Sequence, residues 1–391
     1  MDEKLYLDID FNQIFKNGED IGGDRFLFKK VDARSRVIAV LSDGLGSGVK
    51  ANILASMTAT MALKFIEEKR DIEHFAGIIM DALPICQVRN ISYATFTIID
   101  VHIDGYTKII EMDNPPFTLI RNNQILEIPY STIKSSKIQN RTMKIYEFYM
   151  HANDYLAVYS DGVTQSGMGN KTFHRGFGDK NVQEFICQIV TANNSINAND
   201  LSWKIVSEAI KHETNYKALD DITAAVFHMR TLKDLMLYTG PAYHEENDKV
   251  IAEELANFHG SKVICGGSSA EIIARQWGKK IRINTEGFKH DLPPTSYLQG
   301  TNLVTEGVFT LTRLLEYLEN KSGKNKVDPA GQLYKLLLEH DIINFLVGTR
   351  INVANQDPKM PVHLEFRKTI ILKLEKILTE QFYKEVNIDY F

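Results

Sequence analysis

The chain has 391 residues and carries 45 Lys and Arg against 50 Asp and Glu, a formal net charge of -5. Hydrophobic residues make up 44% and charged residues 24%, so a wholly disordered or fibrous protein is excluded. The length predicts two or three domains, and the slight acidic excess argues against a dedicated nucleic-acid binder.

Cysteine usage and hydropathy indicate the compartment. Cys86, Cys187 and Cys265 lie far apart without CxxC spacing, which argues against a disulfide scaffold and a cysteine zinc site. The first residues lack a basic leader with an apolar core, and no stretch approaches the roughly 20 apolar residues that span a bilayer. We therefore expect a soluble, cytoplasmic protein without a membrane partner.

The first 230 residues contain many β-type runs with helices inserted in pairs. A Gly-rich turn at 43–48 precedes a helix expected over Val49–Arg70, where apolar residues recur at helical spacing. The other expected elements are strands Arg25–Lys30, Arg36–Ser42, Tyr93–Val101, Thr107–Met112, Tyr155–Ser160 and Ile222–Met229, and helices Asp71–Leu83, Val182–Val190 and Leu201–His212. This pattern predicts an α+β fold for residues 1–230.

Near Arg230 the pattern restarts and predicts a second, smaller α/β domain over residues 231–391. Its expected elements are strands Leu232–Tyr238, Lys262–Cys265 and Ile342–Val347, and helices Glu245–Phe258, Ala270–Trp277, Leu311–Glu319, Gln332–Leu338 and Val362–Phe382. The broad apolar face of the last helix, which includes Ile370 and Leu374, suits either core packing or a homodimer interface.

Acidic residues stand at the ends of four β-type runs in the first domain. The motifs are Gly23-Asp24, Ser42-Asp43-Gly44, Ser160-Asp161-Gly162 and Asp220-Asp221-Ile-Thr. A lone Asp-Gly pair usually marks only a turn, but four acidic strand ends together indicate a joint site. Converging carboxylates repel unless a cation neutralises them, and an all-oxygen set suits Mg²⁺ or Mn²⁺. Two such ions can clamp a phosphate and activate a water.

At this point the sequence resembles a known family. Gly23-Asp24, LSDGLGSGVKA (41–51), YSDGV (159–163) and DDITAAVF (220–227) resemble, in order and spacing, the signature of SpoIIE-like phosphatases. These are bacterial members of the metal-dependent PPM protein serine/threonine phosphatases. The resemblance covers about residues 20–230 and implies a β-sandwich of two antiparallel sheets flanked by helix pairs, with two Mn²⁺ or Mg²⁺ ions at one end.

The resemblance also implies site roles. Asp43 would bridge the two ions, and the Gly44 carbonyl would bind one of them. Asp161 and Asp220 would ligate the other side, and Asp24 would ligate directly or through water.

Three positions leave alternatives open. Asp220 is favoured over Asp221 because the family places its ligand first, with Asp221 as the alternative. Arg25 could contact the substrate phosphate or be a solvated strand charge. Leu45 stands where many eukaryotic members carry a histidine, so no residue is assigned to protonate the leaving group.

Glycine-rich turns offer rival interpretations. The turn at 44–48 resembles a nucleotide-binding loop, but its spacing is G-x-G-x-G and no parallel βαβ unit follows. In the second domain, Gly266-Gly267-Ser268-Ser269 lies between a strand and a helix. Either a serine caps that helix, or the turn holds a small anionic ligand.

We therefore expect a phosphoprotein phosphatase that acts on a signalling regulator and is regulated by the second domain. Two alternatives stay open. One is a catalytically silent sensor that keeps the fold as a scaffold. The other is a nucleotide-binding regulatory protein that uses the Gly-rich turns of the second domain.

Overall fold

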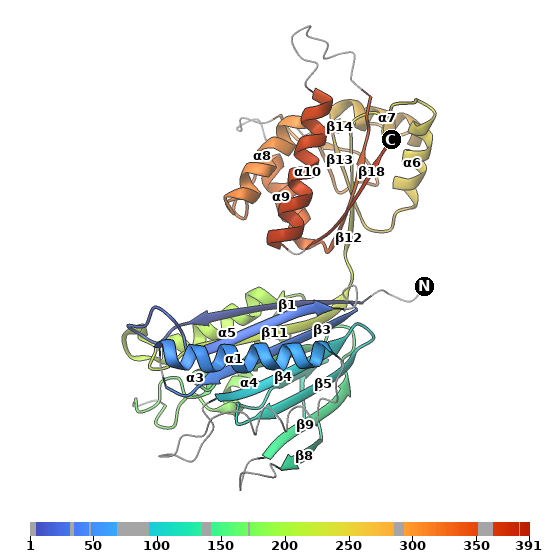
Figure 1. Cartoon of the computed structure of the whole chain (residues 1–391). Helices are drawn as coiled ribbons and strands as arrows, with labels where there is room; N and C mark the ends of the chain where they lie inside the picture. Colours follow the sequence, from blue (N-terminus) through green and yellow to red (C-terminus); the bar gives the residue numbers. More distant parts are fainter. Residues whose placement is uncertain are drawn as a thin grey trace. The chain divides into compact units, whose positions relative to one another are not determined.

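The computed structural model describes residues 5–31, 35–46, 48–68, 94–134, 142–170, 173–284, 293–350, 363–382 and 384–391. The chain folds into two compact units, Met1–Thr231 (unit 1) and Leu232–Phe391 (unit 2). Figure 1 shows the strands and helices of each unit.

The described strands of unit 1 are β1 Leu5–Ile14, β2 Asp24–Val31, β3 Arg36–Gly44, β4 Ala94–His102, β5 Tyr106–Met112, β6 Thr118–Arg121, β7 Gln124–Leu126, β8 Tyr130–Lys134, β9 Thr142–Tyr149, β10 Tyr155–Tyr159 and β11 Ile222–Thr231. Its helices are α1 Gly48–Glu67, α3 Asp161–Thr164, α4 Asp179–Ala192, α5 Ala198–His212 and the 3-10 turn η1 Thr214–Tyr216.

Among the described residues these strands form two sheets. One has the order β1-β11-β10-β6-β7 and the other β2-β3-β4-β5-β9-β8. Every strand pairing within them is antiparallel. A core that includes Phe26, Leu41, Ile99, Leu156 and Phe227 fills the space between the sheets. The expected α+β fold with two antiparallel sheets is therefore confirmed.

Helices cover the outer face of each sheet. Helix α1 packs on β2 and β3 through Ala51, Ala55, Ala59 and Ala62, whose small side chains allow a close approach. Helices α4 and α5 pack on the other sheet as the expected pair. The helix expected over Asp71–Leu83 lies outside the described residues.

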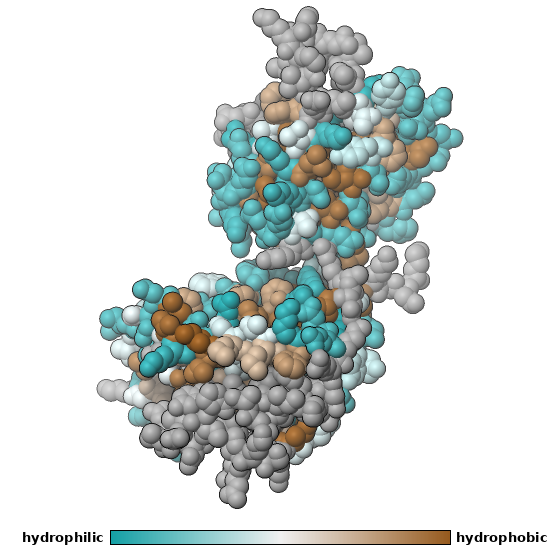
Figure 2. All heavy atoms as spheres, viewed as in Figure 1, coloured by the Kyte–Doolittle hydropathy of each residue, from teal (hydrophilic) through white to brown (hydrophobic). Residues whose placement is uncertain are grey.

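The opposite side of α1 exposes apolar side chains. Val49, Ile53 and Met57 are 60%, 51% and 56% exposed, and their i, i+4, i+8 spacing places them on one stripe of the helix. Figure 2 shows apolar side chains of α1 at the surface of unit 1.

Unit 2 is built around a largely parallel sheet. Its described strands are β12 Asp234–Thr239, β13 Ser261–Cys265, β14 Arg282–Ile283, β15 Ser296–Tyr297, β16 Leu303–Thr305, β17 Ile342–Val347 and β18 Glu385–Tyr390. Its helices are α6 Asn247–Asn257, α7 Gly267–Trp277, α8 Val308–Glu319, α9 Pro329–Glu339 and α10 His363–Phe382. None of the described helices of either unit has the length and apolar composition needed to span a lipid bilayer.

The strand order in unit 2 is β14-β15-β16-β13-β12-β17-β18, and the five strands from β16 to β18 run parallel. The order of these five, in chain sequence, is 3-2-1-4-5, which is that of a doubly wound α/β fold. Helices α6 and α7 pack on one face of this sheet. Helices α8, α9 and α10 pack on the other. The expected α/β architecture of the second domain is present.

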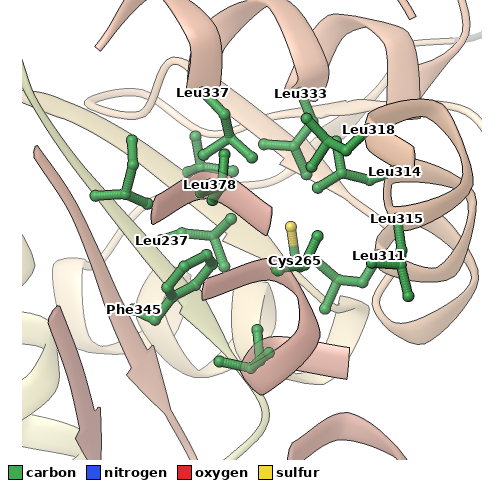
Figure 3. Packing of buried hydrophobic residues seen from close by; sticks show 14 of the residues in the cluster. Leu237, Cys265, Leu311, Leu314, Leu315, Leu318, Leu333, Leu337, Phe345 and Leu378 are labelled. Carbon is green, nitrogen blue, oxygen red and sulfur yellow. The ribbon is translucent and has the colours of Figure 1, made fainter. Parts of the chain in front are cut away.

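The larger core of unit 2 joins its sheet to α8, α9 and α10. Figure 3 shows Cys265 among leucines of this core, where it is fully buried. Ile370, Ile371 and Leu374 of α10 are buried in the same core. These residues of α10 therefore serve core packing, and a homodimer interface stays a prediction.

The sequence pattern did not predict β8, β9, β14, β15 and β16, nor two longer edge strands, β1 and β18. Strand β1 pairs with β11, and β18 pairs with β17 at a sheet edge. Most residues of β1 are half-buried and those of β18 are half-buried or exposed, and polar and acidic residues interrupt the apolar pattern of both strands. Pairing with a neighbouring strand, rather than local pattern, makes them strands.

Candidate functional site

The four acidic motifs meet at one end of the sandwich in unit 1. Asp24 begins β2 and Asp43 lies one residue before the end of β3, and the two are direct cross-strand partners. Asp161 follows β10, and Asp220 and Asp221 precede β11 in the other sheet. Because β10 and β11 pair antiparallel, the end of one lies beside the start of the other. The structure thus brings together carboxylates from both sheets.

Asp24 is held by the opposite sheet. The Thr223 hydroxyl donates a hydrogen bond of 2.6 Å to Asp24 Oδ2. Ser160 Oγ in turn accepts from the Thr223 amide at 3.1 Å. Burial of Asp24 is the main reason that its pKa rises to about 8, with the charges of Asp221 and Asp161 adding to the effect and hydrogen bonds opposing it.

Asp43 stands at the centre of the cluster. Burial raises its pKa to about 9, and repulsion from Asp24, Asp161, Asp220 and Asp221 adds to the shift. Its side chain hydrogen-bonds that of Asp161, whose pKa is also raised, mainly by burial and then by Asp220. Burial and mutual repulsion thus raise the pKa of each of these carboxyl groups, an effect that a bound cation would oppose.

Asp220 and Asp221 differ in what they already bind. Both oxygens of Asp221 accept backbone N–H bonds, one from Lys16 at 2.9 Å and one from Gly23 at 2.5 Å. The exposed Asp220 accepts one bond, from the Asp221 amide at 2.9 Å. Asp221 therefore ties together loops of the two sheets, whereas Asp220 keeps an oxygen for an outside ligand.

Two glycines in the motifs are required by close backbone packing. A Cβ at Gly44 would collide with the carbonyl of Ala51 in α1, and a Cβ at Gly162 would collide with the carbonyl of Asp221. The Gly44 amide donates to the Gly23 carbonyl at 3.2 Å. These contacts hold the Asp43 turn against both α1 and the Asp24 strand.

Arg25 lies on a different face from the carboxylates. Successive residues of a strand point to opposite sides of the sheet, so Arg25 faces away from the side that Asp24 occupies. Its side chain is exposed. Contact between Arg25 and a substrate phosphate stays a prediction.

The four carboxylates are suitable ligands for a hard cation. Asp24, Asp43, Asp161 and Asp220 supply only oxygen, and burial followed by mutual repulsion raises the pKa of all four, which a bound cation would offset. In the described part of the chain, however, no three His, Cys, Asp or Glu side chains stand ready as a metal cluster. Ion binding would thus replace existing contacts such as the one between Asp43 and Asp161.

Sequence patterns gave no role to three neighbours of this site. Thr223 donates to Asp24, Gln165 Nε2 donates to Asp161 Oδ2 at 2.7 Å, and the charge of Lys16 acts on Asp220. Thr223 belongs to the Asp-Asp-Ile-Thr motif, so its proximity could have been anticipated. Lys16 lies outside every motif and could not.

The second candidate site lies in unit 2. Gly266 occupies the position before α7 with φ of 134°, and Gly267, Ser268 and Ser269 form the first turn. Gly266 therefore occupies the cap position, in a backbone conformation that glycine adopts readily, and neither serine caps the helix.

The family model for stage II sporulation protein E (SpoIIE) matches residues 33–230, half of the chain. This chain therefore belongs to the SpoIIE family.

One curated relative is stage II sporulation protein E of Bacillus subtilis (strain 168), which is 25% identical over 150 residues. The match covers 38% of this chain and 18% of that protein, so this chain spans under a fifth of its relative.

Solved structures with a similar fold include the PP2C phosphatase domain with a regulatory-domain fragment of SpoIIE from Bacillus subtilis. It is 17% identical with a TM-score of 0.49, over 59% of this chain and 64% of that one. The RsbU and RsbW domains of Rv1364c from Mycobacterium tuberculosis are 15% identical with a TM-score of 0.47, over 64% and 67%. RsbX in complex with magnesium is 18% identical with a TM-score of 0.40, over 57% and 95%.

Proposed function

We propose that this protein is a protein serine/threonine phosphatase that hydrolyses phosphoserine and phosphothreonine with a water activated by two Mn²⁺ or Mg²⁺ ions. The observation that carries the proposal is the meeting of Asp24, Asp43, Asp161 and Asp220 at one end of the sandwich. Membership of the SpoIIE family supports it. The magnesium bound to RsbX is consistent with this choice of ion.

In this proposal the residues of the chain divide the work. Asp43, the Gly44 carbonyl, Asp161 and Asp220 would hold the ions, and Asp24 would bind directly or through water. The ions, when bound, neutralise the carboxylates, polarise the phosphate and lower the pKa of the attacking water. Asp221 acts as an anchor, because its two oxygens are engaged by the amides of Lys16 and Gly23.

The preference for Asp220 as the ligand follows from the same contacts. A carboxylate that accepts two backbone amides would leave both unsatisfied if it turned toward an ion. Asp220 can bind an ion while keeping its single bond to the Asp221 amide.

The substrate is proposed to be a phosphorylated signalling regulator, acted on in the cytoplasm, with unit 2 as a regulatory domain. Proteins of similar fold are consistent with this class, since SpoIIE is a cell-fate determinant and another belongs to the bacterial stressosome.

The test is Mn²⁺-dependent hydrolysis of p-nitrophenyl phosphate and of a phosphoserine peptide by the full chain. We expect turnover in the wild type that EDTA abolishes and that Asp43→Asn lowers by two orders of magnitude or more, on the order of 3 kcal/mol of transition-state stabilisation. Asp104→Asn is the matched control, because Asp104 accepts the Tyr106 amide in a remote turn. Absence of turnover on both substrates would overturn the proposal and favour a catalytically silent sensor.

A further inference from the structure

The carboxyl edge of the parallel sheet in unit 2 carries four glycines that follow four neighbouring strands. Gly348 follows β17, Gly240 follows β12, Gly266 follows β13 and Gly307 lies two residues beyond β16. We call these four residues the glycine ledge. The register aligns their strands directly, since Thr239 pairs with both Cys265 and Val347.

The turns of the ledge touch in two pairs. A Cβ at Gly348 would collide with the carbonyl of Gly240, and a Cβ at Gly307 would lie 3.4 Å from the Cα of Gly266. Neighbouring strands lie about 4.8 Å apart, so the ledge runs for roughly 15 Å. Because glycine has no Cβ, the Gly240 and Gly348 turns can pack directly against each other.

The topology places this ledge where doubly wound folds bind ligands. In the order 3-2-1-4-5, the direction of strand addition reverses between β12 and β17, and helices leave on opposite faces from there. The crevice at the carboxyl ends of strands flanking such a point is the general ligand position of open α/β sheets.

A cation lies at the same point. The guanidinium of Arg367, from α10, packs so closely over Gly240 that a Cβ there would collide with its Nη1. Nη1 donates to the Gly348 carbonyl at 3.0 Å, whereas the buried Nε has no hydrogen-bond partner in the part of the chain that the structure describes. Within those ranges no carboxylate forms an ion pair with Arg367. A largely buried guanidinium without a counterion calls for an anion.

Two uncapped helix starts supply further donors. Helix α7 begins beside Gly266 and α8 begins after Gly307, and neither has a side-chain cap from the described residues. Their positive ends therefore face the ledge, where the helix dipoles favour an anion. Space is open at Gly267, where an added Cβ would meet no atom within 4 Å.

Two fully buried hydroxyls near the ledge also lack partners among the described residues. Tyr238 precedes the end of β12 by one residue and is 0% exposed, yet its hydroxyl has no hydrogen bond of good geometry there, although the Ala242 amide lies close. The charges of Asp248, Arg367 and Arg350, from three segments at this edge, all act on that hydroxyl. The Thr310 hydroxyl in the first turn of α8 is likewise unpartnered within the described ranges. A fully buried hydroxyl such as that of Thr310 needs a polar neighbour, which a ligand at the ledge would supply.

We propose that unit 2 binds a small molecule carrying a phosphate monoester at the glycine ledge. Arg367 and the first amides of α7 hold the phosphate between Gly240 and Gly266. The rest of the molecule extends along the ledge toward Gly307. This site is separate from the carboxylates of unit 1, and it extends the anion-binding role expected for Gly266 to Ser269.

The test uses the full chain carrying Asp43→Asn, in EDTA, so that the unit 1 site neither binds metal nor consumes the probe. AMP, glycerol phosphate and inorganic phosphate are titrated by calorimetry at millimolar concentration, with adenosine as the uncharged control. We expect the three phosphate probes to bind and adenosine not to bind. The ranking of the three separates recognition of phosphate alone from recognition of a nucleoside or polyol phosphate.

Variants locate the site. Arg367→Met should weaken phosphate binding by roughly tenfold or more, the worth of a charge-assisted hydrogen bond. Gly267→Asp places a carboxylate at the helix start, where it stabilises the helix but repels phosphate, so binding should fall while the melting temperature holds or rises. Arg313→Met, which removes an exposed partner of Glu316, is the charge-matched control and should bind like the parent.

Unchanged affinity in Arg367→Met and Gly267→Asp would overturn the proposal, as would failure of all three phosphate probes to bind. Because the experiment contains no metal, its outcome is independent of phosphatase activity.

Discussion

The two adjacent acids before β11 should separate into a structural and a functional residue. In Asp221→Ala the amides of Lys16 and Gly23, bonded at 2.9 and 2.5 Å, lose a charged acceptor. At about 1.5–3 kcal/mol for each bond to a charged group, the free energy of unfolding of unit 1 should fall by about 3–6 kcal/mol. Asp220→Ala removes one exposed acceptor and relieves repulsion, so its effect should be within about 0.5 kcal/mol.

The assay is urea unfolding in EDTA, read from tryptophan fluorescence. The chain has two tryptophans, Trp203 in unit 1 and Trp277 in unit 2, so a Trp277→Phe background reports on unit 1 alone. Metal binding by calorimetry completes the comparison, and Asp220→Ala should lose it despite full stability. A stable Asp221→Ala together with an unstable Asp220→Ala would refute the division of roles.

Three further outcomes follow from other buried groups of unit 1. Asp100 accepts two hydrogen bonds from the buried Arg36, at 2.8 and 2.7 Å. Asp100→Ala removes this counterion and should lower the free energy of unfolding, measured in urea, by about 3–5 kcal/mol. A decrease under about 1 kcal/mol would contradict this prediction. Burial raises the pKa of Glu111 to about 7, so the folded state holds a proton that the unfolded state releases from about pH 4.5. The stability that this group confers is therefore present below pH 4.5 and is lost as the pH rises toward 7. Over that range the free energy of unfolding of Glu111→Gln should rise by about 3 kcal/mol relative to wild type. Parallel curves of stability against pH would contradict this reasoning. Gly162→Ala forces a Cβ into the Asp221 carbonyl and should lower the melting temperature and metal affinity together, whereas an unaffected variant would mean that the backbone there can yield.

Much of the first domain could be predicted because its signals are local. The apolar runs of β3 and β11 are buried on both faces, so their residues are almost uniformly hydrophobic and mark strands without ambiguity. The acidic motifs at the strand ends also predicted a site, because a carboxylate beside a buried strand rarely lacks a partner. Strands β1 and β18 were missed because edge pairing, not hydrophobic pattern, decides them.

By itself the sequence determined the class of fold in unit 1, the α/β character of unit 2 and the set of acids from which a metal centre would be drawn. Only the tertiary structure decided which acids are free, because that depends on amides of Lys16 and Gly23 about two hundred residues away along the chain. The tertiary structure also places four glycines that are far apart in the sequence at one sheet edge, with Arg367 packed over Gly240. No local signal predicts this, because the strand order depends on how helices pack on both faces of the sheet. The hydrophobic pattern of a sequence predicts which residues are buried. It does not predict which distant residues come together in a site, because that depends on how the strands and helices pack.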